Sequence, residues 1–493
     1  MRFCFEKKDF IDQHINQNQL AIIDSKRELT WNQFEQEVNI FCNYLIENNW
    51  DKLAKPVIIY GHKQAEMIIA IYALMKLKIA YIPIDVIFPE QRILAIQNIV
   101  GIEFVINCTD NNLNLTNTTE IQFQSNTISA KNTSNNLSVK TEIAKDPLIY
   151  IIFTSGSTGE PKGVQITTEA IQTFTKWMAT DFGFTPKDVF INIAILSFDL
   201  SVFELMTFGA IGSTILLNEK TVSENPEKLM SQIEKHKGSI WVSTPSFALT
   251  YSRIGCDPKL KSINYFLFCG ETLPHTLAKS LHSNFTQAKI YNTYGPTEAT
   301  VATTKVEITK EILANYNPLP VGFPKPESQI LIEKDEIVIV GNNVSIGYLN
   351  RPELNKDKFA LINNVRSYKT GDNGFIKDNM LFFSARTDNQ IKLHGFRIEL
   401  DEITSKINDI EIVLQAETLA LKRNGEVKKI VCLIQLTPSI KDLLHSKQHI
   451  TDTLAKSLPH YMIPSDFKFI DKIPLNQNGK ADKKELENIY LND

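Results

Sequence analysis

The chain has 493 residues, of which 43% are apolar and 22% charged, with a formal net charge of −4. This length exceeds what one hydrophobic core usually holds, so we expect a globular protein with at least two domains. Lys and Arg are spread along the chain without a basic stripe, which argues against a nucleic-acid-binding protein. The six cysteines show no CxxC pair and no zinc-ligand spacing.

No targeting or membrane-spanning segment is expected. The amino terminus, MRFCFEKKDF, lacks the apolar core of a secretory signal, and the longest apolar stretch, residues 67–88, is interrupted by Lys76 and Lys78. Together with the cysteine pattern, this predicts a protein of the reduced cytoplasm.

From about residue 55 to 295, short apolar runs alternate with helical patterns, which predicts parallel sheets covered by helices and an α/β fold class. In chain order the runs are PVIIYG near 56, AYIPID near 80, FVIN near 104, IYIIFTS near 149, FINIAI near 190, STILL near 213, IWVS near 240, YFLFCG near 265 and KIYNTYG near 289.

Three further regions complete the predicted organisation. Residues 107–136 are rich in Asn, Thr and Ser and are interpreted as a loosely structured surface excursion without a function. Residues 327–385 carry short strands with turn signals, which predicts a smaller β subdomain. The residues after 388 form a unit of about 100 residues with its own helices and strands, so we place a domain boundary near Arg386 to Asp388.

The strongest local motif is IYIIFTSGSTGEPKGVQIT, residues 149–167. An apolar strand delivers a loop of Thr, Ser and Gly, in which backbone N–H groups and hydroxyls can converge on a phosphate. The loop lacks the GxxxxGK[ST] spacing of a Walker A motif. A flexible surface turn is the alternative. The predicted phosphate contacts are Thr154, Ser155, Gly156, Ser157, Thr158, Gly159 and Lys162.

Further motifs follow this loop: YNTYGPTEAT (291–300), VGNNVSIGYLNRPELNKDKF (340–359), YKTGD (368–372), ARTDNQIKLHGFRIELDEI (385–403) and IPLNQNGKADKKEL (473–486). In this order, and over nearly the whole chain, they resemble the adenylate-forming enzymes, which include acyl-CoA synthetases, luciferases and nonribosomal-peptide adenylation domains. The resemblance implies a large core, residues 1–387, that holds ATP and an amino acid. It also implies a mobile small α+β domain, residues 388–493.

The Gly295-Pro296 turn presents Thr297, whose hydroxyl can bind phosphate, and Glu298, whose carboxylate can hold Mg²⁺. We expect both side chains to take part in catalysis. The resemblance implies that Asn292 contacts the adenine of ATP, on which Tyr294 stacks.

The other expected ATP contacts lie in later or flanking motifs. Asp372 follows a Gly at a strand end and can accept hydrogen bonds from both ribose hydroxyls, the role that the resemblance implies. Arg386 resembles the second ribose or phosphate contact, which suits a guanidinium. Gly270 and Glu271 complete the expected set.

The resemblance also assigns three roles in the small domain. Lys480 is expected to bridge the substrate carboxylate and the α-phosphate, because a cation must offset the charge repulsion between them. Asp388 matches the hinge about which the small domain pivots. After that rotation, the loop at His394-Gly395 is expected to enter the site and make room for a pantetheine arm.

LSFDLSVFEL, residues 196–205, resembles the acyl-pocket motif of the family. The resemblance implies an amino-acid substrate, because enzymes of the amino-acid branch keep a carboxylate at the position of Asp199 to pair with the α-ammonium. No complementary charge is present for Lys, Asp or Glu substrates, and Phe203 and Leu267 shorten the cavity. The expected pocket residues are Asp199, Leu200, Phe203, Ser243, Leu267, Cys269, Thr293, Val301 and Ala302.

Several segments, among them FLFCGETLP (266–274), resemble the branch of D-alanine:D-alanyl carrier protein ligases. In that branch the residue matching Cys269 crowds the α-carbon and helps to select the D enantiomer; ordinary core packing is the alternative. The resemblance implies transfer of D-alanine to a phosphopantetheinylated carrier protein in trans, as in lipoteichoic acid biosynthesis of the cell wall. The alternatives are a natural-product adenylation enzyme for L-alanine, glycine or serine, and a catalytically silent relative.

Overall fold

A computed structural model describes most of the chain. The described residues are 16–124, 127–131, 146–156, 159–252, 258–386, 388–393, 395–423, 426–438, 440, 442–474 and 481–492. They divide into two compact units. The first unit comprises the described residues within Met1–Asp85, Val100–Ile152 and Gly163–Thr387, and the second those within Val86–Ile99, Phe153–Lys162 and Asp388–Asp493. The domain division expected from the sequence stays a prediction.

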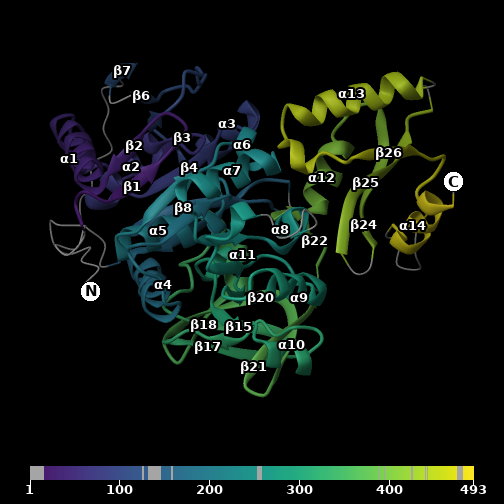
Figure 1. The fold of residues 1–493 in the computed structure, drawn as a ribbon. Coiled ribbons are helices and arrows are strands. Elements are labelled where there is room, and N and C mark those ends of the chain that lie inside the picture. Colours follow the sequence, from purple (N-terminus) through teal and green to yellow (C-terminus); the bar gives the residue numbers. More distant parts are fainter. Residues whose placement is uncertain are drawn as a thin grey trace. The chain divides into compact units, whose positions relative to one another are not determined.

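The first unit contains a mixed sheet of nine described strands, part of which is labelled in Figure 1. Its six central strands pair in parallel, and antiparallel strands flank them at both edges. In spatial order the strands are β16 (Phe323–Pro324), β15 (Thr304–Glu307), β14 (Lys289–Tyr294), β13 (Tyr265–Phe268), β12 (Ile240–Ser243), β10 (Val189–Asn192), β11 (Thr214–Leu217), β1 (Leu20–Ile23) and β2 (Glu28–Thr30).

A second sheet has seven described strands. Their order is β7 (Thr127–Lys131), β6 (Thr119–Gln124), β5 (Phe104–Asn107), β3 (Val57–Gly61), β4 (Tyr81–Asp85), β8 (Leu148–Thr154) and β9 (Lys162–Thr167). The central strands are almost entirely apolar and buried, as expected for parallel strands covered on both faces.

The interpretation of residues 107–136 as a loosely structured excursion was wrong for β6 and β7. These strands form an antiparallel hairpin, and β6 continues the sheet in parallel with β5. Ile121 and Phe123 alternate with polar residues and are buried, and the Phe123 ring stacks on Phe41 at 4.3 Å between centroids. The polar composition concealed this two-residue periodicity.

Helices connect the strands of the first unit. Thr30 and Gln33 form a capping box at the start of α1, and all ten residues of α5 are buried, which is typical of a core helix. The helices are α1 (Trp31–Glu47), η1 (Trp50–Lys52), α2 (Ala65–Lys76), α4 (Thr168–Asp181), η2 (Asp199–Ser201), α5 (Val202–Ile211), α6 (Lys220–Ser223), α7 (Pro226–His236), α8 (Pro245–Ser252), η3 (Pro258–Leu260), α9 (His275–Asn284), η4 (Thr297–Ala299), α10 (Lys310–Asn315) and α11 (Pro352–Lys358).

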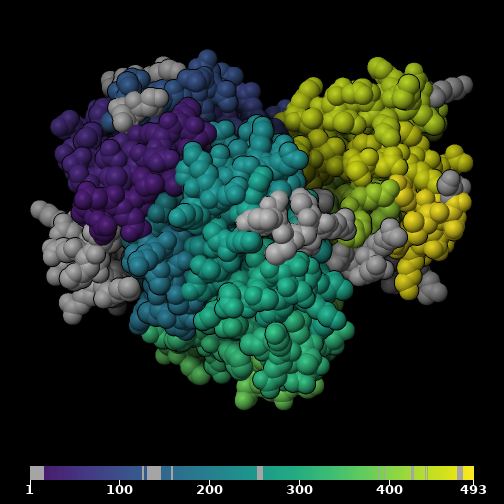
Figure 2. All heavy atoms as spheres, viewed as in Figure 1, coloured from purple at the N-terminus to yellow at the C-terminus, as the bar shows by residue number. Residues whose placement is uncertain are grey.

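The predicted small β subdomain is present as an antiparallel sheet of five described strands. They are β17 (Ser328–Glu333), β18 (Glu336–Gly341), β19 (Phe359–Ile362), β20 (Val365–Lys377) and β21 (Met380–Arg386). Its apolar residues share a core with Tyr294, Ala299 and Val321 of the first unit. On the face shown in Figure 2, the green spheres of this sheet adjoin the teal spheres that precede them in the chain.

The second unit contains helix α3 (Glu90–Val100), except for its last residue, which belongs to the first unit. Its other elements are β22 (Gln390–Leu393), β23 (Phe396–Glu399), α12 (Leu400–Asn408), β24 (Val413–Arg423), β25 (Glu426–Leu436), α13 (Leu443–Ala455), η5 (His460–Met462), β26 (Asp466–Phe469) and α14 (Lys483–Leu491). Strands β24, β25 and β26 form one sheet, and β22 pairs with β23. The predicted α/β class with a small α+β part is confirmed. Among the described residues, no helix combines the length and apolar character that crossing a membrane requires.

Candidate functional site

The carboxyl ends of β12, β13 and β14 bring predicted site residues to one edge of the nine-stranded sheet. Ser243 is in register with Phe268, and Phe268 with Asn292. One residue further along, Cys269 directly follows β13 and Thr293 lies near the end of the neighbouring strand β14. Ligands of open α/β sheets bind at this edge.

Asp199 and Thr297 are brought into direct contact, although 98 positions separate them in the chain. The Thr297 hydroxyl donates to Asp199 Oδ2 at 2.6 Å, from η4 to the start of η2. Asp199 is half-buried and Thr297 is buried. Asp199, predicted to bind the α-ammonium of the amino acid, is thus adjacent to Thr297, predicted to bind phosphate. Adenylate formation requires such proximity, because it joins the carboxylate of the amino acid to a phosphate of ATP.

Most predicted pocket residues belong to one hydrophobic cluster. Phe203, Leu267, Cys269, Val301 and Ala302 are buried in it, and Leu200 packs against its margin. Cys269 Sγ lies 3.8 Å from the carbonyl oxygen of Val301.

The two hydroxyl-bearing pocket residues are engaged with protein groups. The Thr293 hydroxyl donates to the Phe268 carbonyl at 2.8 Å, and Ser243 Oγ accepts from Trp241 Nε1 at 2.7 Å. Ser243 Oγ also donates to the Thr244 carbonyl at 2.9 Å. These bonds fix the orientation of both side chains, so their expected contribution to a pocket is its shape.

Tyr294, Asp372 and Arg386 form the second group that the tertiary structure assembles. Tyr294 Oη donates to Asp372 Oδ2 at 2.7 Å, and Arg386 Nη1 lies 2.6 Å from Asp372 Oδ1. Burial and the neighbouring Asp372 raise the pKa of Tyr294 well above its usual value, so this hydroxyl keeps its proton and acts as a donor. Three residues expected to contact adenosine are therefore linked by hydrogen bonds.

Asn292 provides a test of whether this region suits a nucleotide. Its Nδ2 donates to the Pro320 carbonyl at 2.8 Å, whereas its buried Oδ1 accepts no hydrogen bond from the described residues. Leaving such an acceptor unsatisfied costs roughly 1–3 kcal/mol. The exocyclic amine of adenine is a donor of the required kind, so the side chain fits its expected role.

The turn after β14 requires glycine. A Cβ on Gly295 would lie 2.5 Å from Ala302 Cα and 2.8 Å from Thr303 N, closer than real Cβ atoms come to backbone. Glu298 follows on η4, fully buried, and accepts a 2.6 Å hydrogen bond from Tyr348 Oη. The carboxylate predicted to hold a metal is therefore fixed in position.

Gly270 and Glu271 occupy the loop after β13. Gly270 has a φ of +92°, which glycine adopts without strain. Glu271 accepts hydrogen bonds from Ser246, at 3.0 Å from the backbone nitrogen and 2.9 Å from Oγ. This carboxylate therefore joins the loop to α8.

In the second unit, the predicted phosphate loop binds carboxylates. The Gly156 N–H donates to Glu402 Oε2 at 3.1 Å, and Lys162 Nζ lies 3.1 Å from Glu399 Oε1. Ser155 Oγ donates to the Arg397 carbonyl at 3.0 Å. The Gly156 N–H and Lys162 Nζ therefore bind anionic oxygen, as the donors of a phosphate loop must.

Glycine is also required inside this loop, because a Cβ on Gly156 would meet the Glu160 carbonyl oxygen at 2.0 Å. Gly159 has a φ of +80°. Thr154 is buried, and its Oγ1 has no hydrogen-bond partner among the described residues. Ser157, Thr158, His394 and Lys480 lie outside the described residues.

Sequence reasoning missed Glu399, Glu402 and Arg92. Arg92 Nη1 lies 2.9 Å from Glu402 Oε1, with both side chains almost fully buried. The two acidic residues stand in the IELDEI segment that carries the family resemblance. The acidic residues of this motif were therefore a signal of a functional role. Their partners could not be predicted, because Gly156, Lys162 and Arg92 are remote in sequence.

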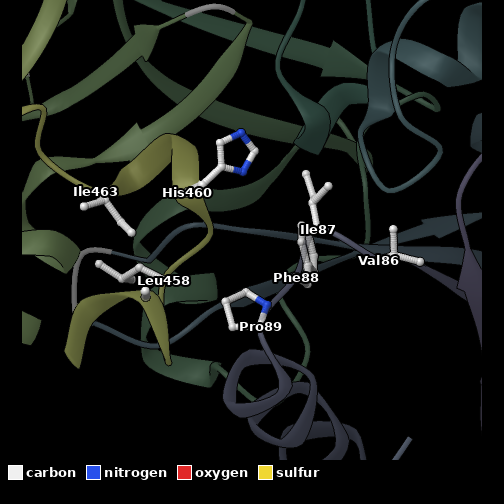
Figure 3. A pocket seen from close by; sticks show the side chains of 8 residues that line it. Val86, Ile87, Phe88, Pro89, Leu458, His460 and Ile463 are labelled. Carbon is white, nitrogen blue, oxygen red and sulfur yellow. The ribbon is translucent and has the colours of Figure 1, made fainter. Parts of the chain in front are cut away.

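The second unit also contains a pocket of about 240 Å³, whose lining residues are mostly of apolar type. In Figure 3, Leu458 and Ile463 lie on one side of it and Ile87 and Phe88 on the other, with His460 nearby. None of the predicted site residues is among its lining residues.

Comparison with known proteins decides the family. The family model described as AMP-binding enzyme matches residues 12–349. The chain belongs to this family. It is accordingly an enzyme that uses ATP, and the resemblance seen in the motifs is confirmed.

The chain is similar over nearly its whole length to curated relatives. A D-alanine–D-alanyl carrier protein ligase of Staphylococcus haemolyticus (strain JCSC1435) is 35% identical over 475 residues, covering 96% of each chain. The corresponding ligase of Bacillus mycoides (strain KBAB4) is 36% identical over 496 residues, covering 95% of this chain and 96% of the relative.

Solved structures agree with the fold of this AMP-binding enzyme. An o-succinylbenzoate CoA synthetase of Bacillus subtilis has a TM-score of 0.81 at 19% identity and covers 97% of both chains. An adenylation domain of Vibrio cholerae in complex with glycyl-adenosine-5′-phosphate has the same TM-score and identity, covering 97% of this chain and 96% of its own. At this identity, the likeness concerns the fold alone.

Proposed function

We propose that the chain is an AMP-forming ligase that activates D-alanine and transfers it to a carrier protein. In the first step the D-alanine carboxylate attacks the α-phosphorus of ATP, which forms D-alanyl-adenylate and releases pyrophosphate. In the second, a phosphopantetheine thiol of the carrier attacks the acyl carbon and releases AMP. The identity of 35–36% to ligases named for this reaction, over about 95% of the chain, carries the proposal.

The pocket residues support a small amino acid. Asp199 supplies a carboxylate for the α-ammonium, and it accepts a hydrogen bond from Thr297, a predicted phosphate contact, which supports this role. Phe203 and Leu267 are buried and restrict the space for a substrate side chain. A buried ion pair of substrate and Asp199 requires good geometry to offset desolvation, which Thr297 helps to provide.

The ATP contacts are proposed to be those predicted from the sequence. Asn292, Tyr294, Asp372 and Arg386 would hold the adenosine part. The loop at 154–162 would bind phosphates through donors that bind carboxylates here. Mg²⁺ would be held by Glu298 together with the phosphates, since this ion commonly binds through one or two carboxylates and substrate oxygens.

Lys480 is proposed to stabilise the charge that develops between the two reacting anions. Asp388 is proposed as the pivot for the second step; its Oδ1 accepts a 3.2 Å hydrogen bond from the Gln390 N–H. A reaction that consumes ATP further supports a cytoplasmic location.

The decisive experiment is amino-acid-dependent pyrophosphate exchange with D-alanine, L-alanine, glycine and L-serine. We expect the highest kcat/KM for D-alanine, and transfer of labelled D-alanine to a phosphopantetheinylated D-alanyl carrier protein. A preference for L-alanine, glycine or L-serine would replace the proposal with a natural-product adenylation enzyme. An absence of exchange with all four would indicate the catalytically silent alternative.

Cys269→Ala is expected to raise kcat/KM for L-alanine with little loss for D-alanine. If the buried sulfur lies beside the substrate α-carbon, its removal admits the L-methyl group, and one such contact is worth about 1–3 kcal/mol in discrimination. Pyrophosphate exchange with both enantiomers measures the change.

Cys42→Ala is the matched control for this substitution. The Cys42 thiol is equally buried, 4% exposed in each case, and lies 3.6 Å from the Ala73 carbonyl, as Cys269 lies beside that of Val301. It should leave the enantiomer ratio unchanged. If Cys269→Ala also leaves the ratio of kcat/KM for D-alanine to that for L-alanine unchanged, Cys269 only packs in the core.

A further inference from the structure

The segment that follows the YGPTEA motif is a strained turn. Thr300 and Val301 have φ values of 55° and 66°, in the left-handed region that β-branched residues rarely adopt. The Ala302 N–H donates to the Thr300 carbonyl at 2.8 Å, which closes a three-residue γ-turn around Val301. Strained residues of this kind persist only where surrounding structure holds them, and they gather at functional sites.

Asn343 holds the beginning of this turn. Its Nδ2 donates to the Ala299 carbonyl at 2.9 Å and to Thr303 Oγ1 at 3.0 Å, and its own carbonyl accepts from Thr300 Oγ1 at 2.7 Å. Asn343 is completely buried. These hydrogen bonds tie the turn to the segment that follows β18.

The other end of the turn is held by a lysine. Lys325 Nζ donates to the Ala302 carbonyl at 2.8 Å, while the Lys325 backbone N–H donates to the Thr303 carbonyl at 2.8 Å. The side chain is 2% exposed. Two consecutive carbonyl groups after Val301 are therefore bound by one residue.

The surroundings of Lys325 are aromatic. Its Nζ lies 5.4 Å from the ring centroid of Phe174 and 5.5 Å from that of Trp177, both on α4. Among the described residues, Lys325 forms no ion pair with a carboxylate. Burial lowers the pKa of Lys325 to about 7, and the nitrogen can donate to Ala302 either as ammonium or as amine.

Phe174 connects this lysine to the amino-acid pocket. Its ring packs edge-on against Phe203 at 5.3 Å between centroids. A methionine would fill nearly the same space as Lys325 without the cost of burying a polar nitrogen. What the lysine adds is its hydrogen bond to Ala302, a residue of the predicted pocket wall.

We propose that Lys325 is a positioning residue for amino-acid binding, which holds the strained Thr300–Ala302 turn and so fixes the pocket wall formed by Val301 and Ala302. The inference rests on the proposed function only in taking D-alanine as the substrate. It concerns the shape of the pocket, so it applies to whichever small amino acid the enzyme activates.

The test is Lys325→Met in the full chain, assayed by pyrophosphate exchange with ATP and amino acid varied separately. We expect the KM for D-alanine to rise about tenfold, the effect of one buried hydrogen bond, while the KM for ATP stays within twofold. The wall should also loosen, so kcat/KM for D-2-aminobutyrate relative to D-alanine should rise. Equal changes in both KM values, or no change in either, would overturn the inference.

Lys305→Met is the matched control. Lys305 is half-buried on β15, and its Nζ lies 4.2 Å from the centroid of the Phe182 ring and donates to the Asp181 carbonyl, away from the turn. It should leave both KM values within twofold.

The role of Lys325 can still be tested if Lys325→Met does not fold or if the enzyme activates another amino acid. Should Lys325→Met not fold, Lys325→Gln keeps an N–H donor and should show a milder form of the same effect: a KM for the amino acid that rises by less than tenfold but by more than the KM for ATP. A KM for ATP that rises as much as that for the amino acid would overturn the inference. Should the wild type prefer another amino acid, the proposed function fails, and the same ratio measured with that amino acid still decides the role of Lys325.

Discussion

Replacing Lys480 with alanine is expected to lower the rate of adenylate formation by about 10²–10³-fold. The substrate carboxylate and the triphosphate repel each other, and a positioned cation that stabilises the developing charge is worth this much in comparable sites. D-alanine-dependent pyrophosphate exchange measures the loss. Transfer from supplied D-alanyl-adenylate to the carrier thiol should be nearly unchanged, because the lysine is assigned to the first step alone.

Lys483→Ala is the control for this substitution. Lys483 is close in sequence, 38% exposed, and paired with Glu417 at 3.1 Å. Its replacement should change neither step by more than about threefold, since exposed ion pairs contribute little. A comparable loss of both steps in Lys480→Ala would contradict the assignment of this lysine to adenylation.

Asp199→Ala is expected to raise the KM for the amino acid by about 10- to 100-fold, with a change in the KM for ATP of less than about threefold. The substitution removes the proposed partner of the α-ammonium, and a hydrogen bond to a charged group contributes about 1.5–3 kcal/mol. Asp199 is half-buried before substrate binds, so we expect a smaller effect than for a fully buried pair.

Two further variants separate binding from structure. Asp199→Asn keeps an acceptor for the Thr297 hydroxyl, at 2.6 Å in the native chain, but removes the charge. It should therefore resemble Asp199→Ala in amino-acid KM while preserving thermal stability. Asp181→Ala, at an exposed carboxylate of α4, should affect neither KM. Equal effects of Asp199→Ala on the two substrates would make Asp199 a structural residue.

Much of the fold could be predicted from local patterns. Strands β3, β4, β5, β8 and β10 to β14 were found because buried parallel strands are continuous apolar runs, which adjacent residues define. The hairpin of β6 and β7 was missed because its polar residues dominate the composition, while Ile121 and Phe123 alone show which face is buried. Its pairing with β5 depends on residues brought together by folding.

The motifs likewise identified the candidate residues of the site, because loops that approach phosphates need glycine and donors at fixed spacing. The residues that contact these candidates could not be predicted from the sequence. The contact of Asp199 with Thr297 joins residues 98 positions apart, and that of Gly156 with Glu402 joins residues 246 positions apart. No spacing rule connects such positions, because only the packing of several elements sets the distance.

Lys325 shows most clearly what could not be predicted from the sequence. In the sequence it is one lysine in a Pro-flanked segment and resembles a surface residue. Only the tertiary structure buries it between Phe174 and Trp177 and directs its nitrogen to Ala302. The sequence thus determined which residue types carry the chemistry, whereas the chain's packing decided which side chains hold the strained wall beside them.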